Sequence, residues 1–183
     1  MSNRTMAVFQ TIRNLFVPFA QDTAPEVVRP APWTTYEVKP LTIKHLDELL
    51  RLNLRCFRNG ENYNKHTFKY LLTQPHALGY MATTETGDIV GFVLVVRNDD
   101  GTAHITTVGV APEHRRRGIA ERLIEQVDEA LKRREISTVV LEVRVSNVAA
   151  QNLYRRAGYN VVQRMQRYYH NGEDGFLMMK SLV

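Results

Sequence analysis

The chain has 183 residues and a mass of 21.1 kDa, which is enough for one well-buried core. Its 44% hydrophobic and 23% charged residues are typical of globular proteins. The single cysteine, Cys56, excludes an intramolecular disulfide framework and fits a reducing compartment, so we expect a cytoplasmic protein. No apolar run approaches the ~20 residues that a membrane-spanning helix needs. The net charge of +5 suits an anionic partner but is more often a property of a solvated surface.

Residues 1–35 are expected to form an N-terminal extension, ahead of a compact domain of residues 36–183. An amphipathic segment comes first, and its apolar residues at helical spacing are Val8, Phe9, Ile12, Leu15, Phe16 and Phe19. A connector rich in proline follows, with Pro25, Pro30 and Pro32. We expect the amphipathic segment to dock on the domain or on a second subunit. A targeting peptide and contact with a membrane surface stay open as less favoured alternatives.

The first half of the domain predicts two helices followed by an antiparallel pair of strands. Alternation in Tyr36–Leu41 predicts the first strand, and Thr42 precedes a helix with an apolar stripe from Leu46 to Phe57. A second short helix is expected over Thr67–Thr73. The next two strands are expected at His76–Thr84 and Ile89–Arg97.

The second half predicts a strand–helix–strand crossover, then a helix and a final hairpin. The crossover joins the strand Ala103–Val110, through a helix from Ile119, to the strand Thr138–Val145. A crossover of this length makes the two strands parallel neighbours. The remaining elements are a helix after Ser146-Asn147 and hairpin strands at Tyr159–Arg167 and Phe176–Leu182. The predicted fold class is α/β, with a mixed central sheet and helices on both faces.

Three consecutive arginines lie between the strand Ala103–Val110 and the helix that follows it. Arg115-Arg116-Arg117 precede Gly118-Ile119-Ala120, so fixed positive charge meets the N-terminus of a helix. Unpaired N–H groups and the positive end of the helix dipole favour an anion there, and phosphate is the natural candidate. The run lacks the Gly-Lys-Ser/Thr of a P-loop and is not Gly-x-Gly-x-x-Gly, which disfavours a nucleoside triphosphate with magnesium.

This turn resembles the pyrophosphate motif Arg/Gln-x-x-Gly-x-Gly/Ala of the GCN5-related N-acetyltransferases (GNAT superfamily). Leu141–Asn147 is similar to the subset that acetylates protein α-amino groups, which includes the bacterial ribosomal-protein-alanine N-acetyltransferases and their archaeal counterparts. Further matching segments are Asn152-Leu153-Tyr154, Gly158-Tyr159, Arg167-Tyr168-Tyr169 and Gly172-Glu173-Asp174. The resemblance covers roughly residues 36–182, and the combination of motifs is more specific than any one of them.

The resemblance implies that acetyl-CoA binds as co-substrate, without a metal, in a cleft between two splayed parallel strands. Unpaired backbone groups of such strands suit a peptide-like pantetheine arm. The implied cofactor-binding residues are Val108, Gly109, Val110, Arg115, Arg116, Arg117, Gly118, Ile119, Ala120 and Asn147. Asn147 also has the position of a helix N-cap, and the two roles are compatible.

Glu142 and Tyr154 are the predicted catalytic residues. Glu142 lies on a strand whose other residues are mostly apolar, and burying a carboxylate costs free energy unless it is paired. One interpretation is therefore that Glu142 forms a salt bridge to Arg144 or another arginine. The resemblance implies the other reading, a general base that reaches the substrate amine directly or through water. Two interpretations of Tyr154 stay open. It is either a buried tyrosine whose hydroxyl group has a hydrogen-bond partner or, as the resemblance implies, the acid that protonates the CoA thiolate.

Three tyrosines are the predicted substrate-binding residues: Tyr63 in the loop Arg58–Asn64, and Tyr168 and Tyr169 in the terminal hairpin. On a strand, adjacent residues face opposite sides, so at most one of Tyr168 and Tyr169 is expected to face a given cleft. The six histidines show no metal-ligand spacing and read as surface or core residues.

The predicted function is direct transfer of an acetyl group from acetyl-CoA to the α-amino group of a protein N-terminus, with a ribosomal protein as one candidate substrate. A lysine side chain or a small-molecule amine is the alternative acceptor. A CoA-binding regulator without catalysis is a further alternative. Nucleic-acid binding through Arg115–Arg117 and Lys132–Arg134 is not expected, because the chain lacks an aromatic stacking platform or a reader motif.

Overall fold

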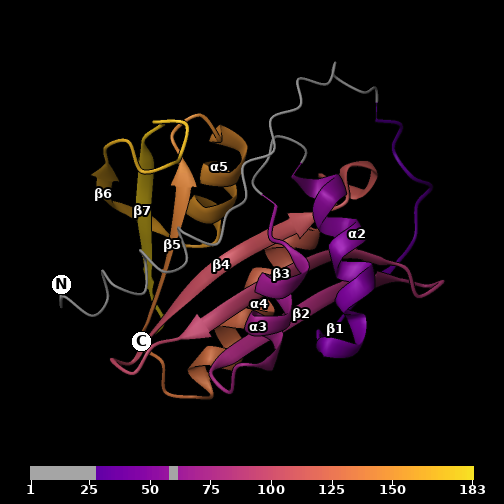
Figure 1. Cartoon of the computed structure of the whole chain (residues 1–183), viewed down its shortest axis with the longest axis horizontal. Coiled ribbons are helices and arrows are strands. Elements are labelled where there is room, and N and C mark those ends of the chain that lie inside the picture. Colours follow the sequence, from indigo (N-terminus) through magenta and orange to yellow (C-terminus); the bar gives the residue numbers. More distant parts are fainter. Residues whose placement is uncertain (1–27, 58–61) are drawn as a thin grey trace.

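One seven-stranded sheet runs through the protein, in the order β1-β2-β3-β4-β5-β7-β6 (Figure 1). This computed structural model describes residues 28–57 and 62–183, so the predicted amphipathic segment of residues 8–19 lies outside the described residues. The strands are β1 (Tyr36–Pro40), β2 (Ala77–Thr84), β3 (Ile89–Arg97), β4 (Thr102–Val110), β5 (Thr138–Arg144), β6 (Asn160–Met165) and β7 (Gly175–Ser181). The α-helices are α2 (Leu46–Cys56), α3 (Lys65–Thr73), α4 (Ile119–Lys132) and α5 (Val148–Arg156).

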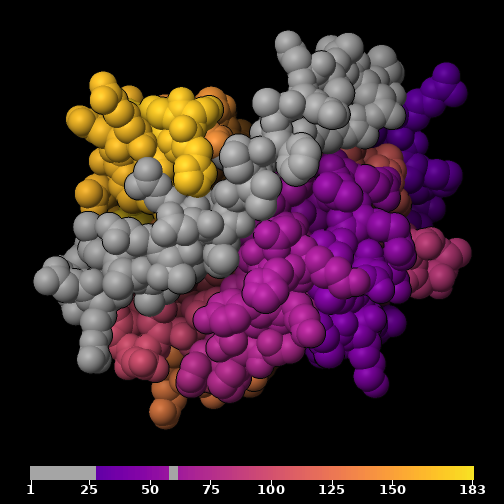
Figure 2. Space-filling view, in the orientation of Figure 1, coloured from indigo at the N-terminus to yellow at the C-terminus, as the bar shows by residue number. Residues whose placement is uncertain are grey.

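Helices cover both faces of the sheet, as predicted. The neighbouring residues Gly91 and Phe92 of β3 show this, because successive residues of a strand point to opposite faces. A Cβ atom on Gly91 would lie 2.9 Å from Ile119 of α4. On the opposite face, Phe92 and Cys56 of α2 both lie next to the Cα of Gly109, where a Cβ atom would meet them at 2.5 and 3.2 Å. Figure 2 shows residues in violet and magenta, the colours of α2 and α3, over much of the face turned toward the viewer.

The core consists of apolar side chains between the sheet and these helices. Each amphipathic helix packs its apolar stripe against the sheet. Fully buried members are Leu49, Phe68, Phe92, Leu94, Leu123, Ile124, Leu131, Leu141 and Met178. Across the described ranges, no helix is both long enough and apolar enough to cross a membrane.

The parallel pair β4 and β5 separates after three residues, which creates the space for a site. Thr102, Ala103 and His104 pair with Thr138, Val139 and Val140, and the strands part beyond these residues. In Figure 1 the two strands start close together and diverge toward their C-terminal ends. The remaining strand pairs are antiparallel. The C-terminal half of β4 therefore keeps an open edge on the side away from β3.

The predicted strand Tyr159–Arg167 is too long at both ends. The observed strand β6 ends at Met165, because Arg167 adopts a left-handed backbone (φ 48°) and its N–H donates to Asp174 Oδ1 at 2.8 Å. Tyr168 and Tyr169 consequently lie in the loop between β6 and β7 rather than on a strand. Their rings meet edge to face, with centroids 5.1 Å apart, so the prediction that they face opposite sides is wrong.

Candidate active site

A cleft of about 530 Å³ lies between the end of β4, the arginine turn and α5. The predicted residues that line it are Val108, Gly109, Val110, Arg115, Arg116, Gly118, Ile119, Ala120, Asn147 and Tyr154. Cys56, His114, Glu121, Leu153 and Arg156 also line it. The lining of this cleft therefore comes from segments that are far apart in the sequence: α2, β4, the arginine turn with the start of α4, and α5.

The open edge of β4 presents the N–H and carbonyl groups of Val108 and the N–H of Val110, whose carbonyl accepts from Arg115. Ala111 N–H donates to Val90 O at 2.8 Å, which fixes the alternation along β4. Because backbone groups of a strand point alternately to its two edges, Gly109 faces β3 while Val108 and Val110 face the cleft. Gly109 is needed for packing, since a Cβ atom there would lie 2.5 Å from the Phe92 ring. A bulge precedes this segment: Thr106 interrupts the pairing with β3, at the place where Tyr63 Oη donates to Thr106 O at 3.1 Å.

The arginine turn directs backbone amides toward the cleft. Arg116 (φ 64°) and Gly118 (φ 74°) are left-handed, and such residues in a turn gather successive N–H groups on one side. The first N–H groups of α4, which begins at Ile119, have no acceptor inside the helix. Arg115 uses its guanidinium internally, donating to Val110 O and to Cys56 O, both at 3.1 Å. Arg116 lines the cleft and has no hydrogen-bond or ion-pair partner among the described residues.

Arg117 points away from the cleft. Its guanidinium donates to Pro32 O at 2.9 Å, to Ala31 O and to the Tyr36 hydroxyl, and it lies 5.0 Å from the Trp33 ring centroid. Only the backbone of Arg117 is therefore placed to bind an anion. The end of the predicted N-terminal extension is docked on the turn by these contacts.

Glu142 is hydrogen-bonded to His104, at the point where β4 and β5 separate. The Glu142 Oε2 and His104 Nε2 atoms are 2.6 Å apart, and the two side chains are 10% and 1% exposed. Glu142 Oε1 is buried and has no hydrogen-bond partner among the described residues. A buried polar atom without a partner costs about 1–3 kcal/mol, which indicates a position prepared for a ligand or a water molecule. In the described part of the chain, Glu142 pairs with His104, and Arg144, the arginine nearest to it in sequence, pairs with Glu173.

Tyr154 lies on the inner side of α5, lines the cleft and is 9% exposed. Burial, and after it the charge of Glu142, raises the pKa of Tyr154 to about 12, so its hydroxyl is protonated at neutral pH. Asn147 caps α5, accepting from Ala150 N–H at 3.1 Å. The buried Gln151 donates to Arg144 O and Val145 O and so fixes the start of α5 against the end of β5.

Tyr63 and Tyr169 lie near Glu142, Tyr168 lies beside Tyr169, and none of the three lines the cleft. Burial is the largest cause that raises the pKa of Tyr63 and of Tyr169, and the negative charge of Glu142 is the next largest. Both tyrosines therefore lie near the Glu142 carboxylate. Tyr168 contributes to both shifts. The residues 58–61 of the predicted substrate loop lie outside the described residues.

Cys56 lines the cleft but is not activated. Burial, opposed by Arg115 and Arg55, raises the pKa of its thiol to about 12. A thiol with this pKa is protonated at neutral pH and is a poor nucleophile. Within residues 28–57 and 62–183, no group of three or more histidine, cysteine or acidic side chains could hold a metal ion.

The chain belongs to the acetyltransferase (GNAT) family, whose sequence profile matches residues 46–159. It is 35% identical over 148 residues to an N-alpha-acetyltransferase of Caenorhabditis elegans, daf-31, covering 75% of this chain and 80% of the relative. The ribosomal-protein-S18-alanine N-acetyltransferase of Escherichia coli has a similar fold, with a TM-score of 0.74 and 24% identity over 81% of this chain and 95% of that chain. A chain of the NatC complex bound to Gag peptide and CoA is also similar, with a TM-score of 0.71 and 25% identity over 81% and 99% of the two chains.

These similarities confirm the predicted family, the mixed α/β fold and an acyltransferase close to the N-alpha-acetyltransferases. The geometry also reveals two residues whose roles the sequence reasoning missed, His104 and Gln151. His104 pairs with Val96 of β3 and Val108 pairs with Val93, so the bulge at Thr106 leaves His104 and Val108 on opposite faces of the sheet. Simple alternation along β4 therefore gave no signal that His104 meets Glu142.

Proposed function

We propose that this protein transfers the acetyl group of acetyl-CoA to the α-amino group of a protein N-terminus, in a complex that holds both substrates. The observation that carries the proposal is the His104–Glu142 pair at the divergence of β4 and β5, beside a cleft suited to acetyl-CoA. The polypeptide would enter from the side of Tyr63, Tyr168 and Tyr169.

The cleft has the donors that acetyl-CoA needs. The backbone groups of Val108 and the N–H of Val110 suit the amides of the pantetheine arm and the thioester carbonyl, whereas Val110 O already accepts from Arg115. Backbone amides from Arg116 to Ala120, with the guanidinium of Arg116, which lines the cleft, suit the pyrophosphate. Arg115 contributes by fixing the turn, and Asn147 by capping the helix that forms the opposite wall.

Glu142 is the proposed general base and Tyr154 the proposed general acid. An α-ammonium group with a pKa of about 7.7–8.0 must lose a proton before its nitrogen can attack. Glu142 Oε1 would take this proton, directly or through water, while His104 holds the other carboxylate oxygen. When the carbon–sulfur bond breaks, the Tyr154 hydroxyl would give its proton to the departing thiolate.

A lysine side chain or a small amine is the second candidate acceptor. Tyr63, Tyr168 and Tyr169 favour a peptide as acceptor. Three aromatic side chains in this region would leave a narrow entrance to Glu142, which suits an extended polypeptide. The E. coli protein of similar fold acts on a ribosomal protein, which makes a ribosomal protein one candidate substrate. We also propose a cytoplasmic location, which suits a chain with one unpaired cysteine.

Peptides varied at their first two positions, each made with a free and with a blocked α-amine, test the proposal. The protein is incubated with acetyl-CoA and each peptide, and transfer is measured by mass. We expect a gain of one acetyl group on free peptides alone. Equal transfer to blocked peptides would contradict the proposal in favour of a side-chain acceptor.

A further inference from the structure

Arg144 and Glu173 form a partly buried ion pair between β5 and the β6–β7 loop. Arg144 Nη1 lies 2.5 Å from Glu173 Oε2 and donates to Asn171 Oδ1 at 3.1 Å. The two side chains are 19% and 24% exposed, so water screens this pair less than it screens a surface pair. Charge-assisted bonds of this kind fix geometry more strongly than neutral ones.

The same pair fixes Tyr169. The Arg144 guanidinium carbon lies 3.9 Å from the centroid of the Tyr169 ring, within the range of a cation–π contact. Tyr169 N–H donates to Glu173 O at 3.0 Å, and Gly172 N–H donates to Tyr169 O at 2.8 Å. Both the ring and the backbone of Tyr169 thus depend on residues at the ion pair.

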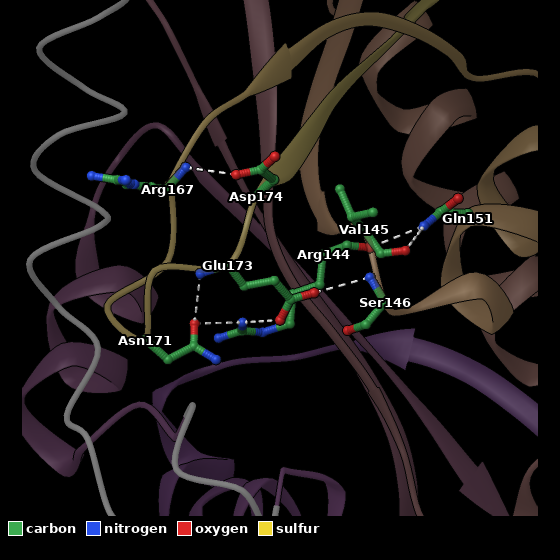
Figure 3. A network of polar contacts seen from close by, with 8 residues as sticks. All are labelled: Arg144, Val145, Ser146, Gln151, Arg167, Asn171, Glu173 and Asp174. Carbon is green, nitrogen blue, oxygen red and sulfur yellow. Dashed lines mark hydrogen bonds and ion pairs between the residues drawn. The ribbon is translucent and has the colours of Figure 1, made fainter.

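Glu173 also reaches the start of α5. Its second carboxylate oxygen, Oε1, accepts from Ser146 N–H at 2.9 Å, one residue before the Asn147 cap. Figure 3 shows Glu173 between Asn171, Arg144 and Ser146, while Gln151 meets the carbonyl groups of Arg144 and Val145 from the side of α5. The loop, the end of β5 and the start of α5 are therefore joined in one network.

Glycine at position 175 completes the arrangement. Gly175 pairs with Arg144 across β5 and β7, and a Cβ atom on it would lie 3.2 Å from the Tyr168 ring and 3.3 Å from the Tyr169 ring. The rings of Tyr168 and Tyr169 consequently pack against the backbone of Gly175. Glu142 lies two residues before Arg144 on the same strand and so on the same face.

We propose that Arg144 and Glu173 are positioning residues for the polypeptide substrate: they hold Tyr168 and Tyr169 at a fixed distance from Glu142 and couple the peptide entrance to α5. This inference rests on the proposed transfer to a protein N-terminus. The pair acts through the tyrosines and not on the reacting atoms. Glu173 stays ionised throughout the working range of pH, since Ser146 N–H and Arg144 outweigh desolvation and hold its pKa at about 2.

The test compares Arg144→Met and Glu173→Gln with a control, Arg164→Gln. Arg164 forms an ion pair of 2.8 Å with Asp174 in the same hairpin, but its side chain is 61% exposed. Among the described residues its polar partner is Asp174, and not a residue of β5 or either tyrosine. We expect the KM for the peptide to rise about 10- to 100-fold in the first two variants, a size typical of misplaced substrate-binding groups. The Kd for acetyl-CoA should change much less than the peptide KM, because neither residue lines the cleft and Asn147 still caps α5 in both variants. The control should change neither constant.

Hydrogen exchange of residues 166–174 supplies a readout that does not need turnover. Arg144→Met and Glu173→Gln should lose protection in this segment, and Arg144→Lys, which keeps the charge without the planar stacking group, should recover part of the KM. Lost protection with an unchanged peptide KM would overturn the proposal and leave the pair a purely structural role. A wild-type protein that acetylates no peptide would instead refute the proposed function, whatever the exchange shows.

Discussion

Replacing Glu142 by glutamine removes the proposed base while almost preserving the size of the side chain. The glutamine carbonyl oxygen can accept the hydrogen bond from His104 Nε2 that Glu142 Oε2 accepts at 2.6 Å. Its NH₂ group then takes the place of Oε1, the buried oxygen that has no partner in the described part of the chain. A charge-assisted hydrogen bond becomes a neutral one, so the free energy of unfolding should fall by only about 1 kcal/mol.

The catalytic loss should be much larger than the loss of stability. General base catalysis contributes about 10²- to 10⁴-fold, which corresponds to roughly 3–5 kcal/mol of transition-state free energy. Single-turnover acetyl transfer to a peptide, followed by mass, measures this loss, and calorimetry with acetyl-CoA measures binding separately. A matched control is Asp128→Asn, which removes a buried carboxylate that pairs with Lys180 at 2.6 Å, away from the cleft. Turnover of Glu142→Gln within about threefold of wild type, with acetyl-CoA binding intact, would refute the role of Glu142 as base.

Four further predictions concern the cleft and its supports. Tyr154→Phe should reduce the maximal rate by about 10²-fold or more without weakening acetyl-CoA binding; an unchanged rate would exclude Tyr154 as the acid. Gly109→Ala should weaken acetyl-CoA binding and lower the melting temperature, because the new Cβ would lie 2.5 Å from Phe92. Gln151→Leu should destabilise the fold by about 1–3 kcal/mol, measured by urea unfolding, because the carbonyl groups of Arg144 and Val145 lose their donor. The pKa of Glu173 is lowered to about 2, so the stability that it contributes is complete above about pH 4.5 and disappears as the pH falls toward 2. Acid unfolding should therefore separate wild type from Glu173→Gln at neutral pH and bring them together near pH 2.

The sheet, the helices and the arginine turn were predictable because local patterns encode them. Period-two alternation, apolar stripes and turn residues placed nearly every strand and helix within a few residues of its observed position. The parallel pairing of β4 and β5 followed from the crossover rule. Gly118 supplied a further local signal, since its left-handed backbone at the start of α4 suits glycine.

The three arginines show where local patterns end. Identical in type and adjacent in sequence, they take three different roles: Arg115 binds carbonyl oxygens inside the turn, Arg116 faces the cleft, and Arg117 clamps Ala31 and Pro32. This division depends on the left-handed backbone of Arg116 and on the docking of a connector about 85 residues earlier in the chain.

The partners of Glu142 and Arg144 were not predictable either. Arg144 offered the nearest positive charge to Glu142 in sequence, but the register of β4 and β5 brings His104 to Glu142, and the β6–β7 loop brings Glu173 to Arg144. Register and loop placement are set by packing over the whole sheet. The early end of β6 has the same origin, because the carboxylate of Asp174 binds the backbone of Arg167 from across the hairpin.

The position of the acetyl group on a single peptide decides whether the acceptor is the α-amine or a lysine side chain. The peptide carries both a free α-amine and an internal lysine, and is incubated with acetyl-CoA and the wild-type protein. Fragmentation in a mass spectrometer then locates the added group. We expect acetylation of the α-amine, with the product reduced at least about 100-fold by Glu142→Gln. Acetylation of the lysine, or transfer that survives the loss of Glu142, would contradict this expectation.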